Sequence, residues 1–248
     1  MLATDQIPVS TRWPWWKQMV ARTWNQKGGY IDAHRGALGR AIAVAVMATE
    51  SAGAATSSLG EPVIRVENHK LWSNKEALTV DWGQKNPETY AKYFRKDEAP
   101  YGHLVNFDGS EDESAWQPFH GSQTQEWRVF DLAARLAGRE VAARCISIGA
   151  GQVMGFNAQK LGYRTAEEML DDMTSSVQAN VGGVFAFIEA NEKAKKALAA
   201  KDYEGFAAEY NGEKCKVSYG GYTAANVAYF EALEAEFLSG DKDKEQQA

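Results

Sequence analysis

The stretch GALGRAIAVAVMAT, residues 36–49, followed directly by Glu50 and Ser51, decides the fold class of this 248-residue chain. Every side chain from Ala41 to Ala48 is apolar, so apolar groups cover all faces of the predicted helix rather than one stripe. Such a helix is enclosed by other helices. The run is also far shorter than the about 20 residues that cross a bilayer, so no membrane span is expected.

Helical patterns continue away from this stretch. Apolar residues spaced by three or four predict an amphipathic helix over 124–145. The sequence TAEE at 165–168 fits a capping box, which opens a second helix with one apolar face reaching Ile188. Shorter helices are predicted at 194–200 and 203–210, and a last helix ends near Phe237.

The other segments have different patterns. PVIRVENHKLW, residues 62–72, predicts a short strand or hairpin, and residues 74–122 have no sustained period and are interpreted as an insertion. Residues 1–35 are rich in Trp and are expected to be an irregular extension with a short helix through Trp24, packed on the domain. Residues 240–248 are expected to be disordered. Residues 36–239 therefore form one α+β domain, mostly helical with a small β-hairpin element.

The net charge and the search for targeting signals limit the classes of function that fit the chain. With 27 Lys and Arg against 33 Asp and Glu, the net charge of −6 lacks the basic footprint of a nucleic-acid binder. The first residues have no basic region followed by an apolar one, so no signal peptide is expected. The chain is expected to be made in the cytoplasm, and any action outside it needs another carrier.

Metal chemistry is not expected. Cys145 and Cys215 form no CxxC motif and are interpreted as two reduced thiols, with a disulfide between them as the alternative. The four histidines do not pair on one helical face as metal ligands do in an HExxH motif: His34, His69, His103 and His120. No metal and no cofactor are predicted.

Glu50 is the first candidate for catalysis. It follows the apolar helix and precedes a loop of small residues, at a border between a dry core and an open surface. Desolvation there would raise the pKa of its carboxyl group, and a carboxylic acid that stays protonated near neutral pH can donate a proton to a leaving oxygen. The simpler interpretation, an exposed residue at a helix end, remains open.

Glu67 is the second candidate. It lies 17 residues after Glu50 on the predicted β element, and a hairpin could bring it back toward Glu50 across a cleft. Glycosidases use two carboxyl groups about 5 to 9.5 Å apart, the wider spacing leaving room for a water molecule. A structural ion pair between Glu67 and the neighbouring Arg65, His69 or Lys70 is the alternative.

Two further segments carry candidates for binding a sugar. In SIGAGQVMGFNAQKLGY, residues 147–163, Gly149 and Gly151 permit a tight turn, and the amides of Gln152 and Asn157 can meet hydroxyl or N-acetyl groups. No strand is predicted before this glycine pair, which argues against a dinucleotide site. In AAEYNGEK, residues 207–214, Tyr210 and Asn211 close a short helix before Gly212, which is ordinary helix-end chemistry.

Five motifs in this order resemble the N-acetylmuramidase domain of modular phage endolysins and, more distantly, soluble lytic transglycosylases and goose-type lysozymes. They span residues 37–237: ATESAG, VIRVENHKLW, QEWRVFDLAARL, SIGAGQVMGFNAQKLGY and FAAEYNGEK. The resemblance implies a lysozyme-like fold and cleavage of the β-1,4 bond between N-acetylmuramic acid and N-acetylglucosamine in peptidoglycan glycan strands. It makes Glu50 the catalytic acid, because Glu50 occupies the position of the family's Glu-Ser motif.

The resemblance also implies substrate contacts by the matched residues Ser51, His69, Gln152, Tyr210 and Asn211. The sequence departs from the family in two motifs: Asn68 replaces an Arg in Phe-Glu-Arg-His, and Ile148 replaces a Trp in Ser-Trp-Gly. These departures leave three hypotheses. The first is a muramidase in which Glu67 positions water or stabilises the sugar cation, the second a lytic transglycosylase that forms 1,6-anhydro ends, and the third a non-catalytic peptidoglycan-binding or scaffold module.

The resemblance further suggests a bacteriolytic role in phage lysis or as a secreted antimicrobial effector. Delivery by a holin or a secretion system would then bring the chain to the periplasm or cell wall.

Overall fold

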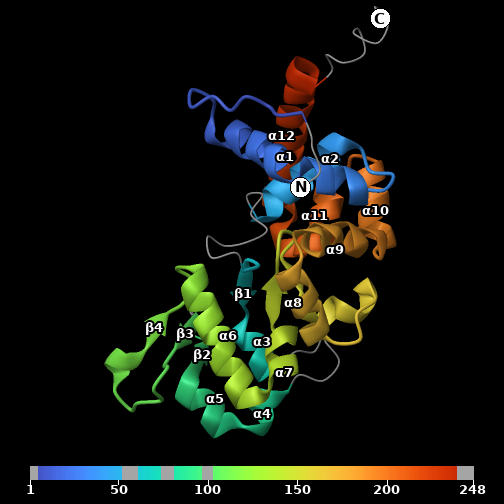
Figure 1. Cartoon of the computed structure of the whole chain (residues 1–248). Helices are drawn as coiled ribbons and strands as arrows, with labels where there is room; N and C mark the ends of the chain where they lie inside the picture. Colours follow the sequence, from blue (N-terminus) through green and yellow to red (C-terminus); the bar gives the residue numbers. More distant parts are fainter. Residues whose placement is uncertain (1–4, 52–60, 74–80, 97–102, 239–248) are drawn as a thin grey trace, which may run out of the picture. The chain divides into compact units, whose positions relative to one another are not determined.

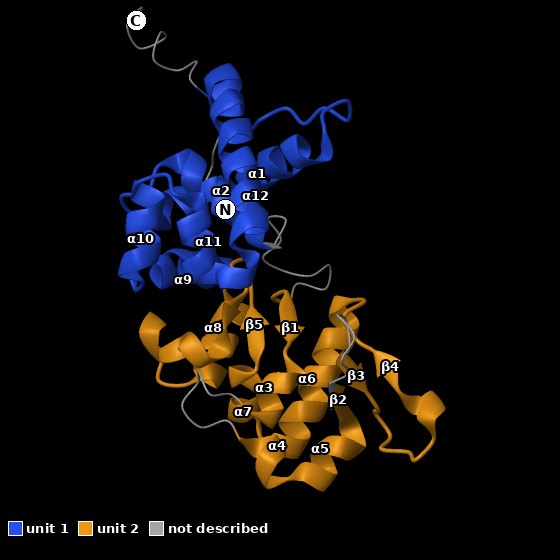
Figure 2. Cartoon of the chain, turned by 180° about the vertical axis from the view of Figure 1, so that it is seen from behind, with its two compact units in different colours: residues 1–55, 177–248 blue, residues 56–176 orange. Residues whose placement is uncertain are grey.

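The computed structural model describes residues 5–51, 61–73, 81–96 and 103–238. Most of these residues are helical, and short strands form two small antiparallel sheets (Figure 1), which confirms the predicted mostly helical α+β class. Two compact units are present, one made of residues 1–55 and 177–248 and one of residues 56–176 (Figure 2). None of the helices in the described ranges is both long and apolar enough to cross a bilayer.

The first unit, called unit 1, is built from helices. They are α1 (Trp15–His34), α2 (Arg40–Ser51), α9 (Val177–Glu189), α10 (Glu192–Ala199), α11 (Tyr203–Asn211) and α12 (Lys216–Leu233), and α12 continues as a π-helical turn over Glu234–Leu238.

The predicted enclosed helix is confirmed as α2. Its residues 43–48 are at most 1% exposed, and α2 packs against both α12 and α1. Small side chains let helices approach closely, as they also do where α11 meets α12. A Cβ atom on Gly220 of α12 would lie 2.8 Å from the Cα of Glu204, so this contact requires glycine. The close packing fixes the end of α2 relative to α11 and α12.

The second unit, called unit 2, contains both sheets. One has the strand order β1 (Ile64–Val66), β5 (Ile146–Ile148), β6 (Val153–Met154), and the other the order β2 (Phe94–Lys96), β3 (His103–Val105), β4 (Gln117–Pro118). The helices of unit 2 are α3 (Asn68–Trp72), α4 (Trp82–Lys85), α5 (Pro87–Tyr93), α6 (Gln123–Ala137), α7 (Arg139–Arg144) and α8 (Ala166–Ser175), with 3-10 turns η1 (Glu113–Ala115) and η2 (Gly155–Leu161).

The β element differs from the predicted hairpin because β1 pairs with a distant strand. Ile64 lies opposite Ile148, and Val66 opposite Ile146, in antiparallel register. The other edge of β1 is satisfied by side chains of α6. Gln123 accepts from the Ile64 amide at 2.8 Å and donates to the Ile64 carbonyl at 2.9 Å, while Glu126 accepts from the Val66 amide at 2.8 Å. A three-residue strand is therefore held on both edges.

Two helices were predicted to be continuous, and both predictions were wrong because each helix is interrupted. The helix expected over 124–145 ends at Ala137, because Gly138 has a φ of +93° that a right-handed helix does not allow, and α7 begins after it. The helix expected from 165 to 188 stops at Ser175, and the extended Ser176 separates α8 from α9. The Thr165 cap is confirmed, since its hydroxyl accepts from the Glu168 amide at 3.0 Å.

Three other expectations need correction. The N-terminal segment is not irregular, because α1 runs for 20 residues, and Gly28 within it lets the Trp24 ring lie against the helix backbone. The described part of residues 74–122 contains β2, β3 and β4, where no regular element was expected, and the interpretation of this segment as an insertion stays a prediction. A strand, β5, does precede Gly149, but it is a short antiparallel strand followed by β6, so a dinucleotide-binding unit is still absent there. Residues 240–248 lie outside the described residues.

Candidate active site

Glu50 lies in the last turn of α2 in unit 1, and its neighbours anchor that turn. The Asn226 amide of α12 donates to the hydroxyl of Thr49 at 3.0 Å. The facing helix α11 has defined ends, because Asp202 caps its start by accepting from the Gly205 amide at 2.9 Å and Gly212, with a φ of +95°, ends it. Asn211 is therefore held at the end of α11.

The Asn211 side chain contacts the Glu50 carboxyl group directly. Nδ2 of Asn211 donates to Oε2 of Glu50 at 2.9 Å. The other oxygen, Oε1, is buried and has no hydrogen-bond partner among the described residues. Burying a charged carboxylate oxygen without a hydrogen-bond donor costs free energy. A protonated oxygen avoids this cost and has a hydrogen that it can donate.

The environment of Glu50 favours the protonated acid. Burial raises the pKa of Glu50 to about 8, against a smaller opposing effect of the Asn211 hydrogen bond. Burial also raises the pKa of Tyr210, as does the charge of nearby Glu50, so its hydroxyl stays protonated. Glu50, Tyr210 and Asn211 therefore lie together within unit 1, and their roles toward a substrate stay predictions.

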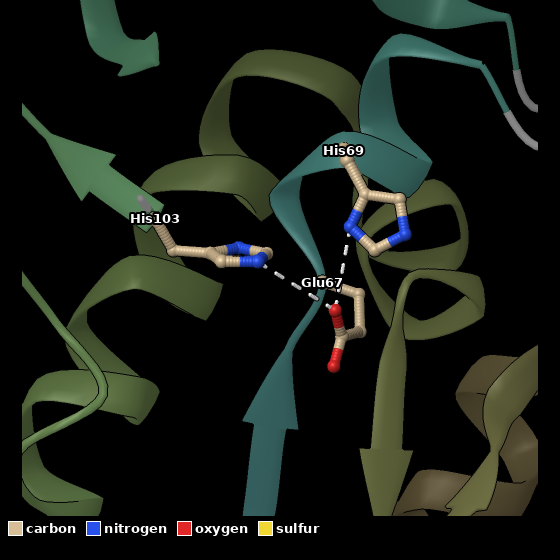
Figure 3. A group of neighbouring side chains, drawn as sticks. All are labelled: Glu67, His69 and His103. Atoms are coloured by element: carbon tan, nitrogen blue, oxygen red, sulfur yellow. Dashed lines mark ion pairs between the residues drawn. The ribbon is translucent and has the colours of Figure 1, made fainter. Parts of the chain in front are cut away.

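Glu67 lies in unit 2, directly after β1 and before the first residue of α3. Its amide donates to the carbonyl of Cys145 at 2.9 Å, which ties the turn to the end of α7. Oε1 of its carboxylate lies 3.3 Å from Nε of Arg65, and Oε2 lies 3.3 Å from Nδ1 of His69 and 4.0 Å from Nε2 of His103 (Figure 3). Burial raises the pKa of Glu67, and the positive charge of Arg65 opposes this effect.

Arg65 and His69, two of the ion-pair partners expected from the sequence, do lie beside this carboxylate, whereas the approach of His103 was not expected. A second carboxylate of unit 2 also pairs with a histidine: Nδ1 of His120 lies 2.7 Å from Oε1 of Glu126, a residue that is 5% exposed. Gln123 and Glu126 are three residues apart on α6, so they share the face that holds β1. That spacing was readable in the sequence. The approach of His103 and His120 was not, because the pairing of β3 with β4 brings them together.

The structure also places the other residues predicted to bind a sugar, namely Gln152, Asn157 and Ser51. Gln152, with a positive φ of 47°, accepts from the Ser147 hydroxyl at 2.8 Å and donates to the carbonyls of Gly149 and Val63, so its amide braces the β5–β6 turn. Asn157 lies in η2 and is 5% exposed, so a contact with a sugar would need that turn to open. Ser51 closes α2, and its side chain lies outside the described residues.

The two cysteines are free thiols and belong to different units, Cys145 to unit 2 and Cys215 to unit 1. The expected closeness of Glu50 and Glu67 likewise concerns residues of both units and stays a prediction.

A sheltered, protonated carboxyl group at a helix end is the general acid that glycoside hydrolases use, and here it lies in a mostly helical α+β protein. The comparisons with known proteins agree. The chain belongs to the N-acetylmuramidase family, whose model matches residues 40–229. It is a muramidase, a glycosidase that degrades peptidoglycan, as the motifs had predicted.

A crystal structure of a Burkholderia AP3 phage endolysin is similar in fold, with a TM-score of 0.56. The alignment covers 87% of this chain and 71% of the endolysin at 22% sequence identity. No curated protein is significantly similar in sequence.

Proposed function

We propose that the chain hydrolyses the β-1,4 bond between N-acetylmuramic acid and N-acetylglucosamine, with Glu50 as the general acid. The observation that carries this proposal is the state of the Glu50 carboxyl group: Oε2 accepts from Asn211, and the buried Oε1 has no partner among the described residues. A proton on Oε1 would be given to the glycosidic oxygen as the bond breaks and the sugar gains oxocarbenium character. No cofactor is needed for this step.

Glu67 is proposed as the second carboxyl group, which orders the attacking water or stabilises the sugar cation. The proposed substrate contacts are Ser51, His69, Gln152, Tyr210 and Asn211 of the matched motifs, together with Asn157 if the η2 turn opens. Tyr210 lies near the proposed acid, because the charge of Glu50 contributes to raising the pKa of the Tyr210 hydroxyl.

The deciding experiment measures release of soluble fragments from purified peptidoglycan by the wild type and by Glu50→Gln. The amide keeps an acceptor for Asn211 but has no acidic proton, so the rate should fall by about 10² to 10⁴ or more. Glu209→Gln, an exposed carboxyl group on the same helix as Asn211, is the matched control and should keep the wild-type rate. Wild-type activity in Glu50→Gln would refute the role of Glu50.

Mass spectrometry of the fragments identifies the reaction. Reducing muramic acid ends, heavier by one water than 1,6-anhydro ends, indicate hydrolysis. Anhydro ends would instead identify a lytic transglycosylase, in which Glu50 acts as acid and then as base. Retention of the chain on sacculi without soluble fragments would point to a binding or scaffold module.

For delivery, we propose that the chain is made in the cytoplasm and reaches the cell wall with the help of a holin or a secretion system. The fold similarity to a phage endolysin supports this route. Expression in bacteria with and without a co-expressed holin tests it, because lysis should depend on the holin. Lysis of equal extent without any helper would contradict the proposal.

A further inference from the structure

Two imidazole rings converge on one oxygen atom of unit 2. His69 comes from α3 and His103 from β3, and Figure 3 shows both rings turned toward the Glu67 carboxylate. Both rings approach Oε2, whereas Oε1 faces Arg65. One atom from each of the three residues, Glu67, His69 and His103, lies within 4.8 Å of the other two.

The separations of these ligand atoms are close to those around a small tetrahedral metal ion. Zinc bonds of about 2.0 to 2.2 Å to nitrogen and oxygen place ligand atoms about 3.3 to 3.6 Å apart. The 3.3 Å between His69 and Glu67 already has this value, and the 4.0 Å between His103 and Glu67 would shorten by about 0.4 to 0.7 Å on binding. We propose that Glu67, His69 and His103 bind a zinc-type divalent ion, with the fourth position left to water.

The surroundings favour a cation with a bound water molecule. The His103 and His120 ring centroids are 4.5 Å apart. His120 is oriented by its Nδ1 contact with buried Glu126, and its Nε2 is buried without a hydrogen-bond partner among the described residues. If Nδ1 carries the hydrogen, Nε2 is an acceptor, and a metal-bound water is a donor.

Single-helix spacing could not reveal this site. His69 and His103 are 34 positions apart and belong to different elements, which meet because β2 pairs with β3 and lies beside α3. The cluster also differs from a plain ion pair. One carboxylate oxygen would satisfy a single protonated imidazole, whereas here two rings face the same oxygen.

Metal binding would change the availability of Glu67. With Oε2 bonded to the ion, this oxygen can no longer accept a proton from water or face a sugar cation. Zinc would then inhibit the enzyme, a consequence that rests on the proposed function of Glu67. The binding itself does not rest on that function.

Calorimetric titration of the full chain with zinc chloride at neutral pH tests the site. We expect one zinc ion per chain, with affinity reduced at least about tenfold in His69→Gln and in His103→Gln. His34→Gln removes the histidine of unit 1 and should leave affinity unchanged. All proteins tested carry Cys215→Ser, because a half-buried free thiol can bind zinc on its own, and circular dichroism in EDTA confirms that each is folded.

Cobalt provides a second measurement. The visible spectrum of the Co²⁺ form should show bands of a tetrahedral or five-coordinate ion, which both His variants lose and His34→Gln keeps. Absence of zinc binding in the wild type, or equal binding in His69→Gln and His103→Gln, would overturn the proposal. Neither result depends on peptidoglycan cleavage, so failure of the metal site and failure of the Glu50 mechanism are distinguishable.

Discussion

The amide of Asn211 donates to Oε2 of Glu50 at 2.9 Å, joining the end of α11 to the last turn of α2 across 161 positions of sequence. This bond leaves Oε1 of Glu50 as the oxygen that can carry a transferable proton. The hydrogen bond to Oε2 thus orients the carboxyl group, and Oε1 is the oxygen that can react. The first three predictions below follow from this arrangement.

The rate of peptidoglycan cleavage should fall as the pH rises through about 8, the raised pKa of Glu50. The general acid acts in its protonated form, and that form is lost above its pKa. Initial rates over a pH series should show a decline with the slope of one proton. The residual activity of Glu50→Gln should lack this decline, and a wild-type profile that stays level well above pH 8 would contradict the assignment.

Glu50→Gln should be more thermostable than the wild type at alkaline pH. A carboxyl group whose folded pKa is raised from 4.5 to about 8 stabilises the fold fully below 4.5, and that contribution is lost as the pH rises to about 8. The neutral amide has no such loss. The difference in Tm between the two proteins should therefore grow across this window and then level off. If the difference in Tm between the two proteins were the same at pH 5 and at pH 9, Glu50 would not be desolvated in the folded state.

Asn211→Ala should move the alkaline decline of activity to higher pH. The Asn211 hydrogen bond lowers the pKa of Glu50, so its removal raises that pKa further. Asn226→Ala is the matched control, because it removes another amide that reaches the end of α2 but bonds Thr49 instead. Asn226→Ala should leave the decline where it is, and identical pH profiles for Asn211→Ala and the wild type would show that the bond does not tune Glu50.

Glu126→Ala should destabilise unit 2 by about 1 to 3 kcal/mol, because it leaves the buried Val66 amide and His120 without their acceptor. Urea unfolding measures the loss. Glu113→Ala removes an exposed carboxylate that pairs with Arg95 and should leave the free energy of unfolding nearly unchanged. Similar effects of the two substitutions would mean that Glu126 does not hold β1.

Some features of the structure could be predicted from the sequence and others could not. The apolar run before Glu50 predicted both the enclosed helix α2 and a desolvated acid at its end, since burial follows from an apolar surface on all sides. The Tyr210-Asn211-Gly212 sequence predicted the end of α11. The interruptions at Gly138 and Ser176 were missed, because the helical spacing of apolar residues continues across these positions although the helical backbone conformation does not.

Local pattern thus determined the mostly helical α+β class, the acid at the end of α2 and the family motifs, because periodicity and capping depend on residues a few positions apart. Tertiary structure alone decided which groups meet: Asn211 with Glu50, β1 with β5, and His69 with His103 at Glu67. Those meetings depend on the packing of elements far apart in the chain. They set the burial and hydrogen bonding from which the raised pKa of Glu50 and the proposed metal site both follow.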